Sequence, residues 1–146
     1  MIQRKQTIWL LLAAILNAGL FFFDMYHFES MMNGVTVTQY VRVNDNFVSL
    51  LLAIVITALP FISIFMFGNR TRQKTFVLLS MAATIAFVAY MLMRVSNASG
   101  EGTSAPVNGT YWIGAVLPVV AFVFLIMAFS GIRKDEKLVK SLDRLR

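Results

Sequence analysis

The chain contains no cysteine. This absence excludes disulfides, thiolate metal sites, cysteine nucleophiles and lipid anchors attached to cysteine. Charge is also scarce, because Lys, Arg, Asp and Glu make up only 14% of the 146 residues, whereas 58% are hydrophobic. A soluble domain of this length cannot hide so much apolar surface. The composition therefore indicates an integral membrane protein. It predicts one domain over residues 1–146, because only short polar segments separate the apolar runs.

Charged residues are missing from the interior of every apolar run. Proton relays and ion-coupled carriers generally need such groups inside the membrane. We therefore expect neither a coupled transporter nor an intramembrane hydrolase, and we predict a protein that is not an enzyme and holds no cofactor. The net charge of +6 does not indicate a nucleic-acid partner. The basic residues border the apolar runs, where orientation in a lipid bilayer explains them.

Four apolar runs are predicted to be membrane spans. They cover residues 8–23, 47–67, 76–93 and 111–131. A helix needs about 20 residues to cross roughly 30 Å of hydrocarbon. The first run could also be a signal peptide, because Arg4 and Lys5 precede it. It ends in three phenylalanines and lacks an Ala-x-Ala cleavage pattern, so we interpret it as a retained span.

The basic residues are distributed asymmetrically around these runs. Two precede the first run, three lie in the polar turn of residues 68–75, and six lie in the tail of residues 132–146. Only Arg42 and Arg94 lie on the other side. An excess of Lys and Arg marks the cytoplasmic side of a membrane protein. The sequence thus predicts an all-α membrane protein, an antiparallel bundle of four transmembrane helices with both termini in the cytoplasm.

The first outer loop, residues 24–46, has a mixed polar composition. Within it, β-branched residues fall at alternate positions: Val35, Val37, Val41 and Val43. This period of two predicts a short β segment. A single strand is not stable alone, so it needs a partner from the region of the Asn33-Gly34 turn or from the second outer loop. That second loop, residues 96–109, is small, polar and rich in glycine, and we expect it to lack regular structure.

The two ends of the chain and its central turn resemble a known family. The matching segments are residues 1–4 and 11–15, residues 67–70 with Gln73, and residues 132–139 with Ser141 and 143–146. They resemble the domain-of-unknown-function family 4293, which consists of small four-span membrane proteins of Bacteroidota. The resemblance extends over nearly the full length and is most specific in the tail. It implies a bacterial inner membrane, and it supplies no activity, ligand or catalytic residue.

One cluster of polar residues offers metal-ligand chemistry. Asp24 and His27 would share a face if the first helix continued outward by one turn, and Glu29 would join them only if the helix ended. The simpler interpretation is that these polar residues mark the point where a helix leaves the lipid. We therefore predict no catalytic, cofactor-binding or metal site, and we keep Asp24, His27 and Glu29 as the candidates for a metal.

Asn17 lies in the middle of the first span. It shares a helical face with Ala14, Ala18 and Phe21. A side-chain amide in hydrocarbon costs several kcal/mol unless it is paired. We therefore expect Asn17 to face the bundle and to form a hydrogen bond with another helix.

Other small and polar side chains of the spans are also expected to serve helix packing. Hydroxyl groups in membrane helices commonly bond to their own backbone. This packing role is predicted for Thr57, Ser63, Ser80 and Thr84. In the third span, Ala82, Ala86 and Ala89 form a small-residue face that we expect another helix to approach closely.

The tail combines apolar and basic residues with helical spacing. One face carries Leu138, Val139, Leu142 and Leu145. Basic residues, among them Arg133 and Lys134, surround this face, so the tail is predicted to form an amphipathic C-terminal helix. It could bind anionic lipid at the inner headgroups, or its leucine face could dock on its own bundle or on a membrane or cytoplasmic protein. We favour docking.

These observations favour a non-enzymatic inner-membrane protein that acts as a small structural or interaction subunit. The alternative is a small protein that binds a lipid or another apolar molecule or lets it permeate. Its lining would be a stripe on the second span: Ser49, Thr57, Pro60 and Ser63. A third interpretation is the metal site at the outer membrane face. In each case the lipid bilayer is a partner and nucleic acid is not.

Overall fold

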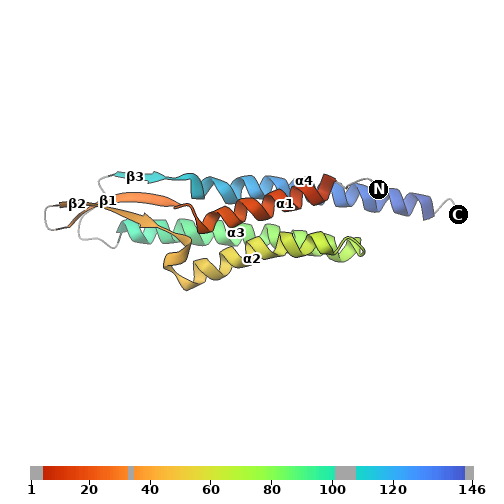
Figure 1. Ribbon diagram of the computed structural model, residues 1–146, viewed down its shortest axis with the longest axis horizontal. Helices are drawn as coiled ribbons and strands as arrows, with labels where there is room; N and C mark the ends of the chain where they lie inside the picture. Colours follow the sequence, from red (N-terminus) through yellow and green to blue (C-terminus); the bar gives the residue numbers. More distant parts are fainter. Residues whose placement is uncertain (1–4, 33–34, 101–107, 144–146) are drawn as a thin grey trace.

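A computed structural model describes the chain except for residues 1–4, 33–34, 101–107 and 144–146. In chain order its elements are α1 (Lys5–Ala18), the 3-10 helix η1 (Gly19–Phe21), β1 (Tyr26–Met32), β2 (Val35–Val41), the 3-10 helix η2 (Val43–Asp45), α2 (Phe47–Phe65), α3 (Arg70–Gly100), β3 (Asn108–Tyr111) and α4 (Ile113–Asp143). The helices run along the long axis of the molecule, and the strands lie together at one end (Figure 1). We call this end the sheet end. The opposite end, where α1 begins and α4 ends, is called the termini end.

Three of the helices in the described part of the chain, α2, α3 and α4, are long and apolar enough to cross a membrane. Helix α1 is shorter. Its 14 residues span about 21 Å at 1.5 Å per residue, against roughly 30 Å of hydrocarbon. The 3-10 helix η1 prolongs it, and the exposed Phe22 and Phe23 then continue its apolar surface. The four predicted runs therefore correspond to four helices, of which the first is the shortest.

Helix α1 lies against α2 and α4, and α3 lies against the same two helices. One apolar cluster joins α1, α3 and α4, and its fully buried members include Leu10, Val77 and Leu125. Small residues on α1 and α4 let the backbones approach closely, because Ala13, Ala121 and Ala128 are also fully buried in this cluster.

The predicted alanine face of the third span was wrong. Ala82, Ala86 and Ala89 are exposed on the surface of α3. The inward face of α3 instead carries Ser80, Thr84 and Phe87, and all three are buried. Larger and more polar residues therefore occupy the interior here, and the alanines face outward.

The strands form one antiparallel sheet in the order β2-β1-β3. In this sheet Tyr26 of β1 lies between Val41 of β2 and Tyr111 of β3. The predicted β segment is thus confirmed for Val35–Val41, whereas Val43 belongs to η2. Both expected sources of a partner contribute, since β1 precedes the turn and β3 comes from the second outer loop. The Asn33-Gly34 turn itself lies outside the described residues.

The sheet packs on the last turns of α3. Met25 and Phe28 from the sheet side form a buried cluster with Met91 and Val95 of α3. This surface explains why α3 continues to Gly100, where the sequence predicted an irregular loop from residue 96. Since β3 begins at Asn108, the loop prediction is left with residues 101–107, which lie outside the described part.

The basic turn between α2 and α3 is shorter than predicted. Helix α2 ends at Phe65 and α3 begins at Arg70, so the three basic residues of the expected turn stand on the first turns of α3. Asn69 caps the N-terminus of this helix, because its side-chain oxygen accepts a hydrogen bond from the backbone N–H of Arg72 at 3.2 Å. The three basic residues nevertheless lie at the termini end, as expected.

The predicted tail helix is continuous with the fourth span. Helix α4 runs without interruption to Asp143 and extends past the other helices (Figure 1). Contacts of Asp135 and Glu136 with α1 and α3 explain why α4 continues past the bundle. The Gln6 side chain donates to the Asp135 carboxylate, and Lys74 Nζ lies 3.0 Å from Glu136 Oε2. Arg70 Nη1 donates to the Asp135 carbonyl oxygen at 2.8 Å. The helix predicted for the tail is therefore confirmed as far as Asp143, and it continues the fourth span without the break predicted at residue 131.

Candidate functional site

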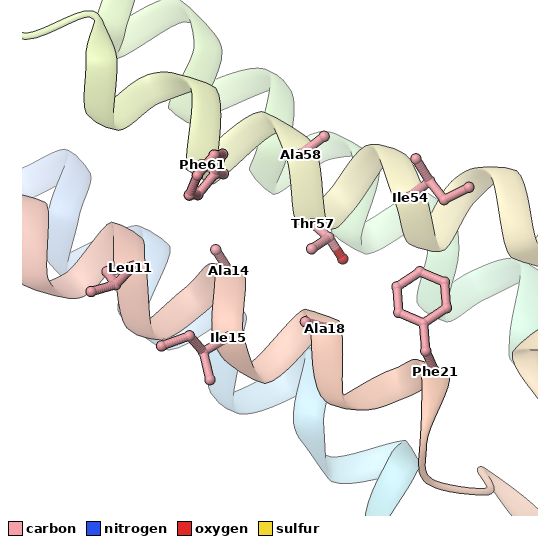
Figure 2. Close-up of a pocket in the computed structure, with 9 residues that line it drawn as sticks. All are labelled: Leu11, Ala14, Ile15, Ala18, Phe21, Ile54, Thr57, Ala58 and Phe61. Carbon is pink, nitrogen blue, oxygen red and sulfur yellow. The ribbon is translucent and has the colours of Figure 1, made fainter.

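A groove runs between α1 and α2 (Figure 2). Its volume is about 380 Å³. Nine residues line it: Leu11, Ala14, Ile15, Ala18 and Phe21 from α1 and η1, and Ile54, Thr57, Ala58 and Phe61 from α2. Thr57 is the one polar residue among these nine. We call this feature the groove.

Small side chains create the space in the middle of the groove. Figure 2 shows Ala14 of α1 pointing toward α2 and Thr57 of α2 pointing toward α1. Ala18 lines the groove one turn after Ala14. The Thr57 hydroxyl donates to the Ala53 carbonyl oxygen at 2.8 Å, so its polar atom is already bonded within α2. The rings of Phe21 and Phe61 lie toward the two ends of the groove. The groove is therefore an apolar surface.

Asn17 joins α1 to α2 beside the groove. It is fully buried, and its Nδ2 donates to the Ile56 carbonyl oxygen at 2.9 Å. In a regular helix this carbonyl would accept the N–H of residue 60, but residue 60 is a proline and has no N–H. Asn17 thus satisfies a carbonyl that Pro60 leaves free. The bond joins two helices, which is the arrangement expected for Asn17.

The stripe predicted to line a lipid site does not line the groove. Ser49, Pro60 and Ser63 are buried between the helices. Of the stripe, only Thr57 reaches the groove, which runs along the neighbouring face of α2. The predicted lining was wrong because the stripe is part of the helix-packing surface.

A second cavity, of about 220 Å³, lies at the sheet end. Its lining residues are Leu20, Phe21, Phe22, Phe23, Asp24, Arg42 and Asn44. The wall is mostly polar, although four of these side chains are apolar. The chain leaves η1 at this point, and the last backbone carbonyl groups of a helix have no partners within the helix. Asn44 Nδ2 donates to the Phe21 carbonyl oxygen at 3.4 Å. We call this cavity the polar pocket. It shares Phe21 with the groove.

An ion pair forms one wall of the polar pocket. Arg42 Nε donates to Asp24 Oδ1, and Arg42 Nη2 donates to Asp24 Oδ2 at 3.3 Å. The hydrogen bond from Arg42 holds the pKa of Asp24 below its ordinary value; burial opposes the shift and the hydrogen bond with His27 adds to it. The same pairing raises the pKa of Arg42. The Asp24 side chain is 18% exposed and that of Arg42 is 51% exposed, so the pocket presents both signs of charge.

His27 connects this ion pair to an aromatic group. Its Nε2 lies 3.1 Å from Asp24 Oδ2, and its ring stacks on Trp112 at 5.0 Å between centroids. The ring of Tyr40 meets His27 edge-on at 4.7 Å. Asp24 and His27 are therefore brought together, but Glu29 does not join them. Among the described residues no three acidic, histidine or cysteine side chains are grouped as metal ligands. Arg42 and His27 both bond to the Asp24 carboxylate, so the arrangement is an ion-pair network.

The remaining predicted packing residues bond mostly to their own helices. Ser80 Oγ donates to the Phe76 carbonyl oxygen at 2.9 Å, and Thr84 Oγ1 donates to the Ser80 carbonyl oxygen at 2.8 Å. Ser63 acts through its backbone, since its carbonyl oxygen accepts from Gln73 Nε2 at 3.1 Å. These contacts hold the helices and leave the groove apolar.

Two buried glutamines were not predicted from the sequence. Gln6 is 6% exposed and Gln73 is 4% exposed, both at the termini end. A signal was present for Gln6, because it continues the inward face of Leu10, Ala13 and Asn17 by one turn. Arg4 and Lys5 directly precede it, so the local sequence indicates a surface residue.

The predicted tail residues are not gathered into one contact surface. The Arg133 guanidinium lies 5.1 Å from the centre of the Phe129 ring, and Lys134 is exposed. Leu138 is 64% exposed. Leu142 lies on α4, with its side chain outside the described part, and Leu145 lies outside the described residues.

Long apolar helices with a small antiparallel sheet at one end define the class of this protein, a small multi-helix membrane protein. The chain belongs to the family Domain of unknown function (DUF4293), whose family model matches residues 2–145. The match covers nearly the whole chain, so the resemblance found in the sequence is confirmed. No curated protein matches the chain.

Proposed function

We propose that this protein is a non-enzymatic, multi-pass protein of the bacterial inner membrane that binds an apolar chain in the groove between α1 and α2. The proposed architecture is a bundle of four transmembrane helices with both termini in the cytoplasm. It is supported by the three helices of sufficient length and by the grouping of Arg70, Arg72 and Lys74 at the termini end. Basic residues favour the cytoplasmic side.

The observation that carries this proposal is the groove itself. Eight of its nine lining residues are apolar, and both of its walls belong to helices whose apolar surfaces suit hydrocarbon. An unfilled apolar space of about 380 Å³ would forfeit the dispersion contacts of its lining. The hydrogen bond from Asn17 to Ile56 fixes the two helices, so the space is formed before a ligand arrives.

Photo-cross-linking in vesicles tests this proposal. The full chain is reconstituted in phosphatidylcholine that contains a small share of phosphatidylcholine with a diazirine on one acyl chain. We expect the adducts to concentrate on groove residues such as Ile15 and Phe61. Equally exposed residues outside the groove, such as Ile85 and Val119, should carry several-fold fewer. An even distribution over all exposed apolar residues would overturn the proposal.

A pair of matched variants strengthens the test. Ala18→Leu places three additional carbons in the groove, whereas Ala86→Leu makes the same change on the exposed face of α3. Because the groove is open, the larger side chain has room and the fold should persist. We expect Ala18→Leu to reduce the adducts in the groove several-fold and Ala86→Leu to leave them unchanged. Equal effects of the two variants would contradict a specific groove.

The second candidate function is that of a small structural or interaction subunit. It is favoured by the length of α4, which extends past the other helices and exposes Leu138. We propose this projecting end as the contact for a membrane or cytoplasmic protein. Affinity purification of the full chain and of a chain ending at residue 137 tests it, since the shorter chain keeps the contacts of Asp135 and Glu136. Equal recovery of partners by both chains would count against this candidate.

A further inference from the structure

The groove and the polar pocket meet at Phe21. The groove begins near Leu11, and the stretch from Leu11 to Phe21 is about 15 Å long at roughly 1.5 Å per residue. This is half of a hydrocarbon layer of roughly 30 Å, which is the depth of one lipid leaflet. An acyl chain that lies along the groove therefore ends, at its carboxyl side, beside the polar pocket.

Aromatic residues place the polar pocket at the level of the lipid headgroups. Trp112 and Tyr40 are 46% and 47% exposed, and both contact His27, which is bonded to Asp24. Tyr111 precedes Trp112 and is 56% exposed. Exposed Trp and Tyr side chains of membrane proteins concentrate at the headgroup level. This observation is independent of the shape of the groove and gives the same depth.

The charges of the polar pocket are those that a zwitterionic headgroup requires. Arg42 has five N–H donors, and its bonds to Asp24 use two of them. The others suit a phosphate, for which a guanidinium is the preferred partner. On the other side, the Asp24 carboxylate and the carbonyl groups at the end of η1 are acceptors, which suit an ammonium group.

We propose that the groove and the polar pocket form a single site for a phospholipid with an ethanolamine headgroup. The acyl chain lies between α1 and α2, the phosphate lies at Arg42, and the ammonium lies at Asp24. This inference rests on the proposed function, because it assigns a headgroup to the chain in the groove.

The acceptors of the pocket distinguish ethanolamine from the other common headgroups. A choline headgroup has the same charges but no N–H, so it cannot donate to the Asp24 carboxylate. A glycerol headgroup has hydroxyl donors but no positive charge, so it cannot form an ion pair with that carboxylate. Ethanolamine alone among the three supplies both a cation and hydrogen-bond donors.

A competition experiment on the unmodified chain tests the headgroup. Full-length protein is placed in nanodiscs that contain equal amounts of phosphatidylethanolamine, its N-methyl and N,N-dimethyl forms, and phosphatidylcholine, all with the same acyl chains. The lipid retained on the protein is then identified by native mass spectrometry. We expect retention to be about tenfold lower for choline than for ethanolamine, because choline alone has no N–H and one charge-assisted hydrogen bond is worth about that factor. The N-methyl and N,N-dimethyl forms, which keep two and one N–H, should be retained better than choline. Equal retention of the four lipids would overturn the inference.

Single substitutions then locate the preference. Asp24→Asn and Arg42→Gln each remove one charge of the polar pocket, and Arg133→Gln removes a charge from α4 at the termini end as a control. We expect the first two to reduce the preference for ethanolamine over choline several-fold and the control to preserve it. If either pocket variant fails to fold, the competition with the unmodified chain still decides the question.

The outcomes separate this inference from the proposed function. Acyl-chain adducts that stay in the groove, together with equal retention of all headgroups, would remove the ethanolamine site and leave the proposed function standing. Adducts spread evenly over the surface would remove both. Preferential retention of phosphatidylglycerol, added as a fifth lipid, would show an anion site and overturn the assignment of Asp24 to an ammonium.

Discussion

Asp24 connects three parts of the sheet end through two different groups. Its carboxylate accepts hydrogen bonds from Arg42 after β2, and its backbone carbonyl accepts the N–H of Gly114 in α4 at 3.1 Å. The second bond requires glycine, because a Cβ on residue 114 would lie 2.5 Å from the Asp24 carbonyl oxygen. One residue thus ties the exit of α1 to β2 and to α4.

We predict that Asp24→Asn removes an acid-sensitive part of the stability. The pKa of Asp24 is lower in the folded protein than its ordinary value of about 4, so the folded state favours the charged form. The resulting stabilisation is complete above that ordinary value and is lost as pH falls through the lowered value. Thermal unfolding in detergent, followed by tryptophan fluorescence from about pH 6 to about pH 3, measures it.

The expected result is that Asp24→Asn melts several degrees below the unmodified protein at about pH 6 and that the difference shrinks as the pH falls below about 4. Glu29→Gln is the control, since Glu29 is an exposed acid of β1 outside the ion pair. A difference between Asp24→Asn and the unmodified protein that stayed constant with pH would contradict the role given to this carboxylate.

At the scale of elements, the α1–α2 pair depends on the relation between Asn17 and Pro60. We predict that Asn17→Leu costs about 1 kcal/mol, because it leaves the Ile56 carbonyl unpaired between two helices. In a Pro60→Ala background residue 60 regains its N–H and bonds to Ile56 itself, so the same substitution should cost less. A double-mutant cycle of unfolding free energies in one detergent measures the difference.

Thr84→Val supplies the comparison for this cycle. The Thr84 hydroxyl bonds within its own helix, to Ser80, so its loss should be independent of residue 60. Equal costs of Asn17→Leu in the two backgrounds would show that Asn17 does not serve the carbonyl freed by Pro60.

The existence of the helices could be predicted from the apolar runs, but their ends could not. Helix α3 reaches Gly100 because the sheet covers Met91 and Val95, and no local signal in the glycine-rich loop reveals that cover. Helix α4 likewise continues because Gln6 and Lys74, distant in sequence, contact its polar turn. In both cases tertiary contacts outweigh local composition.

The candidate site was predictable only in part. The sequence pattern brought Asp24 and His27 together, but Arg42 reaches them only through the register of β1 and β2, which places Tyr26 opposite Val41. The contact of Tyr26 with Gly109 could not be predicted from the sequence either. It requires glycine, since a Cβ on residue 109 would lie 1.7 Å from the Tyr26 hydroxyl oxygen. The groove depends on the relative rotation of α1 and α2, and helical periodicity does not determine that rotation.

For the whole molecule, the proposed topology makes opposite predictions for the two ends. The chain has no cysteine, so single cysteines can be introduced and labelled without a background. Thr110 is exposed at the sheet end and Thr71 is exposed at the termini end. In intact cells with a permeable outer layer, a membrane-impermeant maleimide should label Thr110→Cys. It should label Thr71→Cys only after the inner membrane is opened.

Two results would contradict this topology. One is labelling of Thr71→Cys in sealed cells, and the other is protection of Thr110→Cys. As a control against labelling of unfolded protein, both variants must melt at the same temperature as the unmodified protein. The measurement assigns the polar pocket to one leaflet, since Arg42 and Thr110 lie at the same end.

The strand order connects α1 and α2 at the sheet end. The chain passes from α1 into β1, from β2 through η2 into α2, and from β3 into α4. Since β2 and β3 both form hydrogen bonds with β1, the sheet holds these three helices together at one end. The Asn17–Ile56 hydrogen bond holds α1 and α2 together nearer to Phe21 than to Leu11, so any separation of the two helices should be largest near Leu11 and smallest near Phe21. Acyl chains of different length would then be accommodated at the Leu11 end of the groove, while the contacts of the headgroup in the polar pocket stay the same.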